Sequence, residues 1–309
     1  MSEIKGLVSV IVPTYNRPDL LPRAVLSVIK QTYRNLEVII VADQCLEATG
    51  MVIEGLLRTD SRISALKLAE NVGGAEARNI GIGKVRGEFI AFLDDDDEWL
   101  PEKLDRQIAV ISSDQGLAIV SCNHYLINRG RKVEVKIKPD ITLKDMLYRN
   151  FLGSFSFCVT RKSLLADVRI NRDLKAFQDQ ELWLKILSGS GGCAFVVQEP
   201  LVNYFQSHGY QRLTQQHENT LASLKLLFCE FGHLMNHSQK HYNAAAVGRL
   251  SIAAGGSFSP GRYLKMLMHL CLAKRPVSLQ EIYAFAIQPL FGMGRDNIVK
   301  RAYYRMFGT

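Results

Sequence analysis

The sequence predicts an α/β fold with a mostly parallel central sheet flanked by helices, followed by a helical C-terminal region. Two runs of aliphatic and β-branched residues, 7–12 and 37–41, have the composition of strands buried on both faces. A segment with helical apolar spacing separates them, and beyond about residue 215 only helix-like patterns occur. The chain has 309 residues, and single cores stop growing near roughly 250–300 residues. We therefore expect a domain at 1–215 and a separate helical region at 216–309.

The first βαβ unit shows the clearest pattern. Pro13 closes the first strand, the turn 16–19 precedes the helix, and apolar side chains then recur at helical spacing from Leu20 to Ile29. The strand at 37–41 follows. Connections between parallel strands are right-handed in nearly all proteins, so we expect that hand here.

The same alternation of helix and strand continues to an acidic run. The expected elements are a helix at about 49–59, a strand at 63–68, a helix at about 74–85 and a strand at 89–93. The last strand leads directly into Asp94, Asp95, Asp96 and Asp97. Ligands of open α/β sheets bind beyond the carboxyl ends of the strands, so we expect chemistry at this run. We expect a helix from Pro101 onward, with the proline in the first turn, where a helix tolerates it.

The pattern is looser after residue 121. We expect strands at 117–121, 156–160 and 194–197, a basic, turn-rich link at 128–138 and a helix that carries 179–183. Near the C-terminus, helical segments at 263–272, 282–291 and 298–307 mix apolar and aromatic residues with cations. These cations are Lys265, Lys274, Arg275, Arg295, Lys300, Arg301 and Arg305. Such helices can lie on an anionic membrane surface, although packing on the rest of the protein is the more frequent use of an apolar face.

Composition and charge exclude several classes of protein. The formal net charge of +8 favours an anionic partner, but no zinc-ligand spacing, recognition-helix pattern or aromatic RNA-binding strand occurs, so no nucleic acid is expected. The six cysteines are far apart and form no CxxC pair, which favours reduced thiols and a cytoplasmic location. No secretory apolar segment follows Met1, and no run of about 18 uncharged apolar residues occurs. Peripheral contact with a membrane at the inner face of the cell remains open.

The four consecutive aspartates are the sharpest chemical feature. Crowded carboxylates repel one another and resist ionisation, and a divalent cation removes this conflict. Oxygen ligands suit Mg²⁺ or Mn²⁺, whose coordination substrate phosphates complete. Such an ion can neutralise the charge that grows on a leaving diphosphate. A solvated acidic turn before a helix is the alternative, but the buried strand directly upstream favours a metal site.

Five segments in the same order resemble the family 2 glycosyltransferases of the GT-A fold, which is Rossmann-like. They are 8–17 (VSVIVPTYNR), 31–33 with 37–41 (QTY, EVIIV), Asn71 with 77–79 (ARN), 92–97 with Trp99 and Pro101 (FLDDDD), and 179–183 (DQELW). The resemblance covers roughly residues 5–215. It implies transfer of a hexosyl or N-acetylhexosaminyl group from a nucleoside-diphosphate sugar, with a UDP-sugar expected. The implied acceptor is a glycan or a polyprenyl-diphosphate-linked oligosaccharide in bacterial surface polysaccharide assembly.

The resemblance also implies roles in binding the nucleotide. Pro13 and Tyr15 would border the nucleobase, and Asp43 would hydrogen-bond uracil. Arg78 would lie near the base and the diphosphate. The chain departs from the family at 42–45 (ADQC), where two acidic residues and Gly-Ser are usual. Each of these residues has a structural alternative. Tyr15 is then an ordinary turn aromatic, Asp43 a cap of the next helix and Arg78 a solvated helix charge.

The acidic run matches the D-x-D motif of the family. By that resemblance Asp96 would ligate the metal, and Asp94 would contact ribose or a metal-bound water. Asp95 would join the nucleotide-sugar site and Asp97 would support it. His208 lies in a segment that closes over the donor in some relatives, and it is a second candidate for a metal or phosphate contact. A lone histidine is more often a surface or core residue than a ligand.

A carboxylate must take the proton from the attacking hydroxyl, on the face opposite the leaving diphosphate. Asp179 matches the catalytic base of the family, four residues before Trp183, which implies inversion at the sugar carbon. The family commonly has Glu where this chain has Gln178, and Glu181 is expected to compensate in part. Arg212 and Trp183 are expected phosphate or acceptor contacts. The alternative for Asp179 and Glu181 is that they only stabilise a helix N-terminus. The alternative for Arg212 is a position in a solvated loop.

Two other functions remain open from the sequence. A catalytically silent nucleotide-sugar or glycan-binding protein would keep the same elements with an inert Asp179. A sugar-nucleotide pyrophosphorylase also combines an α/β sheet with a metal, but its glycine-rich loop with a phosphate-facing Arg and Lys is absent after the first strand.

Overall fold

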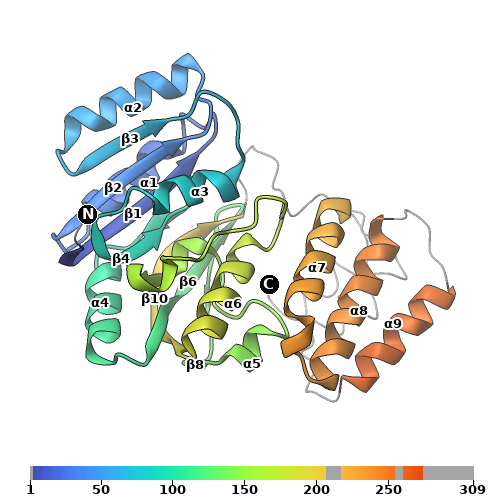
Figure 1. Ribbon diagram of the computed structural model, residues 1–309. Helices are drawn as coiled ribbons and strands as arrows, with labels where there is room; N and C mark the ends of the chain where they lie inside the picture. Colours follow the sequence, from blue (N-terminus) through green and yellow to red (C-terminus); the bar gives the residue numbers. More distant parts are fainter. Residues whose placement is uncertain (1–2, 207–216, 255–259, 274–309) are drawn as a thin grey trace. The chain divides into compact units, whose positions relative to one another are not determined.

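The computed structural model describes residues 3–206, 217–254 and 260–273 and separates the chain into two compact units (Figure 1). Unit 1 comprises the chain up to Arg172 together with Gln178–Gly209. Unit 2 comprises Asp173–Phe177 and the chain from Tyr210 onward. A short segment in the middle of the sequence therefore belongs to the C-terminal unit.

A ten-stranded sheet forms the centre of unit 1, with the order β3-β2-β1-β4-β9-β6-β10-β5, to which β7 adds beside β6 and β8 beside β10. The strands are β1 (Ile4–Thr14), β2 (Leu36–Ala42), β3 (Ile63–Lys67), β4 (Gly87–Phe92), β5 (Glu98–Trp99), β6 (Leu117–Asn128), β7 (Arg131–Val135), β8 (Asp140–Ile141), β9 (Val159–Arg161) and β10 (Cys193–Phe205). The pairs β1–β2, β2–β3, β1–β4 and β6–β10 are parallel. Strand β9 is antiparallel to both β4 and β6. The expected α/β class with a mostly parallel sheet is confirmed.

The two apolar runs become the centre of this sheet. All seven residues of β2 are buried, and so are the last eight of β1. Pro13 has no N–H to donate to a neighbouring strand. It is tolerated in this central strand because the pairing of β1 with β4 ends before it, at Ile11 opposite Phe92, so no hydrogen bond to β4 is lost. On the other side Pro13 lies opposite Val41.

The helices of unit 1 cover the sheet. They are α1 (Leu21–Ile29), α2 (Glu47–Thr59), α3 (Gly74–Ile82), α4 (Lys103–Ser113), α5 (Leu143–Met146) and α6 (Gln178–Ser190). Helix α1 buries Leu21, Ala24, Val25 and Val28, which follow the helical spacing of the sequence. Helix α1 connects β1 to β2, and α2 connects β2 to β3, so both connections run toward the edge strand β3. Helix α3 connects β3 to β4 and so runs in the opposite direction, past β2 and β1. Right-handed connections place α3 on the opposite face from α1 and α2.

Two expectations for the middle of the chain are wrong. The strand expected at 156–160 begins later, because Phe155–Phe157 forms a 3₁₀ helix that the Ser154 hydroxyl caps by accepting a hydrogen bond from the Ser156 N–H. The basic link at 128–138 is a hairpin in which β7 pairs with the end of β6. Its turn uses left-handed backbone at Arg129 and Gly130, with φ of 48° and 78°, and the charged side chains face solvent.

Unit 2 is helical in its described part, as expected. It contains α7 (His217–Phe231), α8 (His237–Ala254) and α9 (Pro260–Leu272). The segment Asp173–Phe177 is held by Ser223 of α7, whose hydroxyl oxygen accepts hydrogen bonds from the N–H groups of Lys175 and Ala176 at 3.0 and 3.1 Å. Among the described residues, no helix is both long and apolar enough to span a membrane.

Candidate active site

The candidate site lies in unit 1, at the carboxyl ends of β1, β2 and β4. These parallel strands end at Thr14, Ala42 and Phe92, and the loops that follow carry most of the site residues expected from the sequence. The backbone joins the loops directly, because the Asp43 N–H donates to the Thr14 carbonyl at 2.9 Å and the Leu93 N–H donates to the Ile11 carbonyl at 3.0 Å. Parallel strands thus bring three distant segments to one sheet edge.

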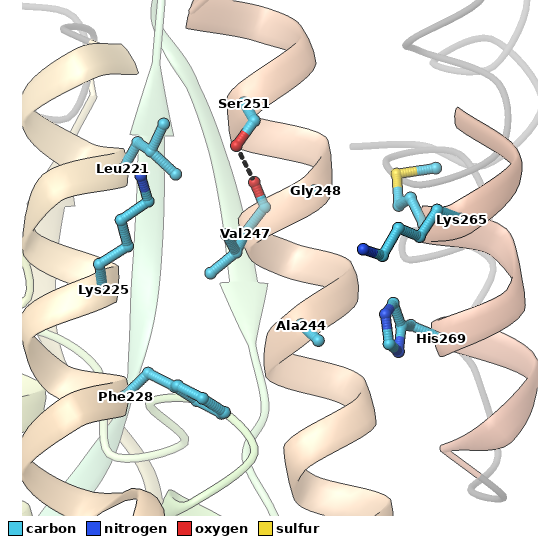
Figure 2. A pocket seen from close by; sticks show the side chains of 10 residues that line it. Leu221, Lys225, Phe228, Ala244, Val247, Gly248, Ser251, Lys265 and His269 are labelled. Carbon is cyan, nitrogen blue, oxygen red and sulfur yellow. Dashed lines mark hydrogen bonds between the residues drawn. The ribbon is translucent and has the colours of Figure 1, made fainter. Parts of the chain in front are cut away.

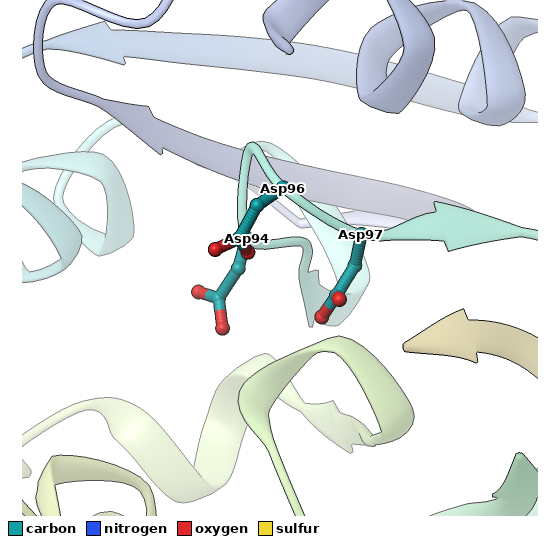
Figure 3. A group of neighbouring side chains, drawn as sticks. All are labelled: Asp94, Asp96 and Asp97. Atoms are coloured by element: carbon teal, nitrogen blue, oxygen red, sulfur yellow. The ribbon is translucent and has the colours of Figure 1, made fainter. Parts of the chain in front are cut away.

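The acidic run forms a tight turn, closed by a hydrogen bond from the Asp97 N–H to the Asp94 carbonyl at 3.0 Å. Asp94, Asp96 and Asp97 each offer a carboxylate oxygen, and these atoms lie within 4.8 Å of one another (Figure 3). Asp94 and Asp96 are half-buried, whereas Asp95 and Asp97 are buried. The two accessible carboxylates are therefore the ones that match the ends of the D-x-D pattern.

Asp95 is turned toward the end of β1. Its two oxygens accept hydrogen bonds from the Thr14 hydroxyl at 2.7 Å and from Arg17 Nη1 at 2.8 Å. The same Arg17 nitrogen lies 3.3 Å from Asp96 Oδ2, and Arg23 Nη2 donates to the Asp96 carbonyl at 2.6 Å. Burial raises the pKa of Asp95 to about 6, against the opposing effect of Arg17. The predicted nucleotide-sugar contact of Asp95 stays a prediction.

Two serines hold the other side of the turn. The Ser154 hydroxyl donates to Asp94 Oδ2 at 3.0 Å, and the Ser156 hydroxyl donates to Asp97 Oδ2 at 2.6 Å. The second oxygen of Asp97 accepts from the Phe205 N–H at 3.3 Å. Burial, followed by the charges of the neighbouring aspartates, raises the pKa of Asp97 well above its usual range. Asp97 is thus fixed inside the turn, and its supporting role stays a prediction.

Arg78 connects the acidic turn to the start of α6. Its Nη2 donates to Asp94 Oδ1, and its Nη1 donates to Gln178 Oε1 and to the Gly74 carbonyl, both at 3.1 Å. The guanidinium also lies over the Phe155 ring, 4.2 Å from the ring centroid. A Cβ at Gly74 would approach Arg78 Nη1 to 3.0 Å, so glycine leaves room for the guanidinium. Arg78 is consequently a half-buried connector in this structure and not a solvated helix charge.

Asp179 lies at the first turn of α6, next to this connector. Its Oδ1 accepts a hydrogen bond from the Gln180 N–H at 2.7 Å. Burial is the first cause that raises the pKa of Asp179 to about 6, the Asp94 charge adds to it, and the Arg78 charge opposes it. Glu181, expected to compensate for Gln178, is instead fully buried beside Lys185 and accepts hydrogen bonds from the Asn171 N–H.

The residues expected at the nucleobase lie at the ends of β1 and β2. Pro13 is buried, and Tyr15 is 49% exposed, so its ring is available to a ligand. Asp43 is buried and accepts hydrogen bonds from the N–H groups of Val72 and Gly73 at 2.7 and 2.8 Å. It therefore caps the loop before α3 and not the next helix along the chain.

Of the remaining expected contacts, the structure describes Trp183. Trp183 is fully buried and packs edge-on against Phe92 and Phe155, with ring centroids 6.3 and 5.7 Å away. The ring supports the acidic turn from the core, and an acceptor contact would require the ring to become exposed. His208 and Arg212 lie outside the described residues.

Five site residues were not predicted from the sequence, namely Thr14, Arg17, Arg23, Ser154 and Ser156. Thr14 and Arg17 lie inside the VSVIVPTYNR segment, so their position after a buried strand was a usable signal. The two serines carry no such signal, because they hydrogen-bond to aspartates 60 and 59 residues earlier in the chain.

The donor set at the turn fits a divalent cation that prefers oxygen. All three grouped side chains are carboxylates, which suits Mg²⁺ or Mn²⁺ and disfavours a structural zinc site. Two of them are half-exposed, which leaves room for substrate oxygens to complete the coordination. The turn can thus hold a cation beside Arg78, and the pair could bind a diphosphate.

Several proteins that are similar to this chain in sequence are glycosyltransferases. TuaG of Bacillus subtilis, a putative teichuronic acid biosynthesis glycosyltransferase, is 29% identical over 206 residues, which are 66% of this chain and 81% of TuaG. WfgD of Escherichia coli, a UDP-Glc:alpha-D-GlcNAc-diphosphoundecaprenol beta-1,3-glucosyltransferase, is 32% identical over 195 residues, which are 62% of this chain and 75% of WfgD. A Campylobacter jejuni GalNAc(5)-diNAcBac-PP-undecaprenol beta-1,3-glucosyltransferase is 33% identical, over 58% of this chain and 59% of that protein.

Solved structures share the fold. Residues 1–349 of Staphylococcus aureus TarS, in complex with UDP-GlcNAc, superpose with a TM-score of 0.61 at 22% identity, covering 90% of this chain and 78% of that one. Against the longer TarS chain, the match covers 47% of that chain. The mannosyltransferase PcManGT from Pyrobaculum calidifontis, in complex with GDP-Man and Mn²⁺, gives a TM-score of 0.55 at 17% identity, over 93% of this chain and 88% of that one. These neighbours confirm the GT-A fold.

The family model described as glycosyl transferase family 2 matches residues 9–205. This span is more than half of the chain, and it contains the acidic turn, Arg78 and Asp179 in one continuous match. The protein is therefore a family 2 glycosyltransferase.

Proposed function

We propose that the protein is an inverting glycosyltransferase that transfers a sugar from a UDP-sugar to a hydroxyl of a glycan or lipid-linked oligosaccharide in bacterial surface polysaccharide assembly. The observation that carries the proposal is that Arg78 bonds to both the acidic turn and Gln178, which precedes Asp179. A cation-binding turn, a guanidinium and a carboxyl with a raised pKa are thus neighbours at one sheet edge.

The acidic turn and Arg78 would bind the sugar donor and stabilise its leaving diphosphate. Asp96, with Asp94, would hold Mg²⁺ or Mn²⁺, which neutralises the charge on the departing diphosphate. Arg78 presents its guanidinium beside Asp94 and orients the diphosphate. Tyr15 would pack on the base, with Pro13 and Asp43 shaping the pocket beneath it. Asp95, His208 and Arg212 are proposed as further donor contacts by resemblance alone.

Asp179 would act as the base of the acceptor half. As the acceptor oxygen forms its bond to the anomeric carbon, its proton passes to the Asp179 carboxylate. The bond from the anomeric carbon to the diphosphate oxygen breaks, and its electron pair leaves with the diphosphate. Attack from the face opposite the leaving group inverts the sugar carbon. A pKa of about 6 makes this carboxylate a stronger base than an ordinary aspartate while it stays largely ionised at neutral pH.

The names of the relatives support the choice of substrates. WfgD is named for UDP-Glc and an acceptor linked to diphosphoundecaprenol. We accordingly propose a hexosyl or N-acetylhexosaminyl transfer, catalytic work in the region 1–215, and an acceptor-side role for 216–309. The proposed location is the cytoplasm, with peripheral contact at the inner face of the cell membrane.

The first test is release of UDP from candidate UDP-sugars in the presence of Mn²⁺, with and without acceptors. Asp96→Ala should reduce release by about a hundredfold or more, because the charge on the leaving diphosphate loses its stabilisation. The mutant should also lose the Mn²⁺-dependent rise in melting temperature that UDP gives the native protein.

The matched control is Glu54→Ala, which removes a carboxylate whose side chain is 49% exposed and paired with Lys67 on the surface. This variant should keep both the UDP release and the melting-temperature shift. Unchanged turnover in Asp96→Ala would refute the metal role of the acidic turn.

A further inference from the structure

The described part of unit 2 contains an open groove of about 680 Å³ across α7, α8 and α9 (Figure 2). Sites for small molecules typically enclose about 300–1,000 Å³. The wall is largely apolar, with Leu221 and Phe228 from α7, Ala244 and Val247 from α8, and Met266 from α9. Its size and lining suit a hydrocarbon chain.

The polar groups of this groove are cationic. Lys225 of α7 and Lys265 of α9 line it, and no described lining residue is acidic. Neither lysine has an ion pair with a described residue, and the ammonium of Lys265 projects toward α8 in Figure 2. The ring of His269 lies against His241, with the two Nδ1 atoms 3.0 Å apart. Burial first, then the nearby His241 and Lys265, lower the pKa of His269, so the lysines carry the charge.

The outer face of α9 adds a second apolar surface. Leu264, Met268 and Leu272 recur every fourth residue and are 61%, 56% and 46% exposed. Large apolar side chains gathered on one exposed helix face mark contact with another molecule or with lipid. The cations of the groove disfavour the chain's own segment 274–309 as occupant, because that segment has six Lys and Arg but only two acidic residues.

We propose that this groove binds one polyprenyl diphosphate lipid, with the isoprenoid chain along the apolar wall and the diphosphate at Lys265. Lys225 on the opposite wall adds positive potential. The inference deepens the proposed function, because such a lipid would carry the acceptor sugar, and it rests on that function for the choice of lipid. Lys225 and Lys265, which have no ion pair with a described residue, lie beside space of the size of a hydrocarbon chain and supply the charge complementarity.

The test measures binding of farnesyl diphosphate to the full-length protein by calorimetry, with EDTA present so that no divalent cation bridges the ligand to the acidic turn. Saturable binding of one ligand per chain is expected. Farnesol and inorganic pyrophosphate should each bind at least about tenfold more weakly, because each lacks one half of the recognised chemistry. Lys265→Glu should weaken farnesyl diphosphate binding by about fivefold or more. Ala244→Trp, which fills the groove, should weaken it by about tenfold or more.

Each variant has a matched control on α8 that does not line the groove. Lys240→Glu makes the same charge change at an exposed position, and Ala246→Trp adds the same ring at a partly exposed one. Both should bind like the native protein, and all four variants should keep its melting temperature within a few degrees. Equal affinities of Lys265→Glu and Lys240→Glu, or of Ala244→Trp and Ala246→Trp, would overturn the site.

Three further outcomes separate this inference from the alternatives. Sedimentation with phosphatidylglycerol vesicles but no binding of farnesyl diphosphate would overturn the groove site in favour of contact with the bilayer surface. If the native protein releases UDP from a UDP-sugar but binds no farnesyl diphosphate, the groove site is refuted and the proposed function stands. Intact lipid binding with no release of UDP from any donor would refute the proposed function and leave the groove standing.

Discussion

Burial divides the four aspartates of the acidic turn into two kinds. Asp94 and Asp96 stay half-exposed, where they can meet a cation, whereas Asp95 and Asp97 are buried and accept hydrogen bonds from protein donors. The buried pair has raised pKa values because each carboxylate loses water. The turn thus combines two buried carboxylates with two that are accessible to a cation.

Asp179 is expected to control the pH dependence of the reaction. Below about pH 6 the carboxyl becomes protonated and cannot accept the acceptor proton, so kcat/KM should fall about tenfold per pH unit on this acidic limb. Asp179→Asn should lower kcat by about 10²- to 10⁴-fold and lose the acidic limb. Steady-state assays between pH 4.5 and 8 measure both effects.

The same variant should be more stable than the native protein at neutral pH. Burial raises the Asp179 pKa from 3.8 to about 6, so the folded state binds the proton more tightly than the unfolded state. Native stability therefore falls as the pH rises from about 4 to about 6, and the loss persists above that range. Asp179→Asn should gain roughly 1–3 kcal/mol at pH 7.5 and lose this gain near pH 4, as measured by urea unfolding. Asp167→Asn, at an exposed position, should change neither activity nor stability, and a destabilised Asp179→Asn would contradict the argument.

At the scale of elements, the close contact of β1 with β4 sets where the acidic turn begins. Gly87 opens β4, and its N–H donates to the Ser9 hydroxyl at 2.9 Å. The β1–β4 register shifts between Ile4 and Val8, which brings the Leu7 carbonyl against Gly87. A Cβ at Gly87 would lie 2.3 Å from that carbonyl oxygen, a distance that only backbone movement could relieve.

We expect Gly87→Ala to destabilise the protein by about 1–3 kcal/mol, because the added methyl group overpacks a backbone contact. The comparison variant is Gly55→Ala in α2, where a Cβ would meet no atom within 4 Å. Alanine favours helix over glycine, so this variant should gain about 0.5–1 kcal/mol. Urea unfolding of both proteins measures the difference, and equal effects of the same sign would show that the β1–β4 contact is not tight.

At the scale of the whole molecule, the segment Asp173–Phe177 links the helical unit to the proposed base. The segment belongs to unit 2, yet the chain passes from it directly into α6, which begins with Gln178 and Asp179. Phe177, at this junction, has a φ of 61°, a left-handed conformation that costs a bulky residue energy. The residue that follows this segment in the chain is Gln178, whose side chain accepts a hydrogen bond from Arg78 within unit 1.

Ser223→Ala should lower kcat more than it changes the KM for the donor. Its hydroxyl oxygen is the acceptor for two N–H groups of the segment, and its loss should cost about 1–3 kcal/mol in stability and loosen the start of α6. Donor binding depends on the acidic turn and should remain. Ser188→Ala in α6 is the control, because the hydrogen bond that this hydroxyl makes to a described residue is to the Lys185 carbonyl of its own helix. Equal loss of kcat and donor affinity in Ser223→Ala would indicate general destabilisation and not positioning.

Much of the donor half of the site could be predicted from the sequence. The strand runs, the helix between them and the position of the aspartates after a buried strand follow from local composition and period, which act over about ten residues. The resemblance added Arg78 and Asp179 because each lies in a contiguous motif. The family match and the parallel strands confirm the family and the fold.

The sequence by itself determined the α/β class, the family and the acidic run at the end of a strand, because adjacent residues encode each of these. Only the tertiary structure decided which aspartates are buried, that Ser154 and Ser156 bond to Asp94 and Asp97, and that Gln178 meets Arg78 100 residues away. It also assigned Asp173–Phe177 to the helical unit. These contacts arise from packing between segments far apart in the chain, and no local pattern of composition or period records which distant side chain fills a given space.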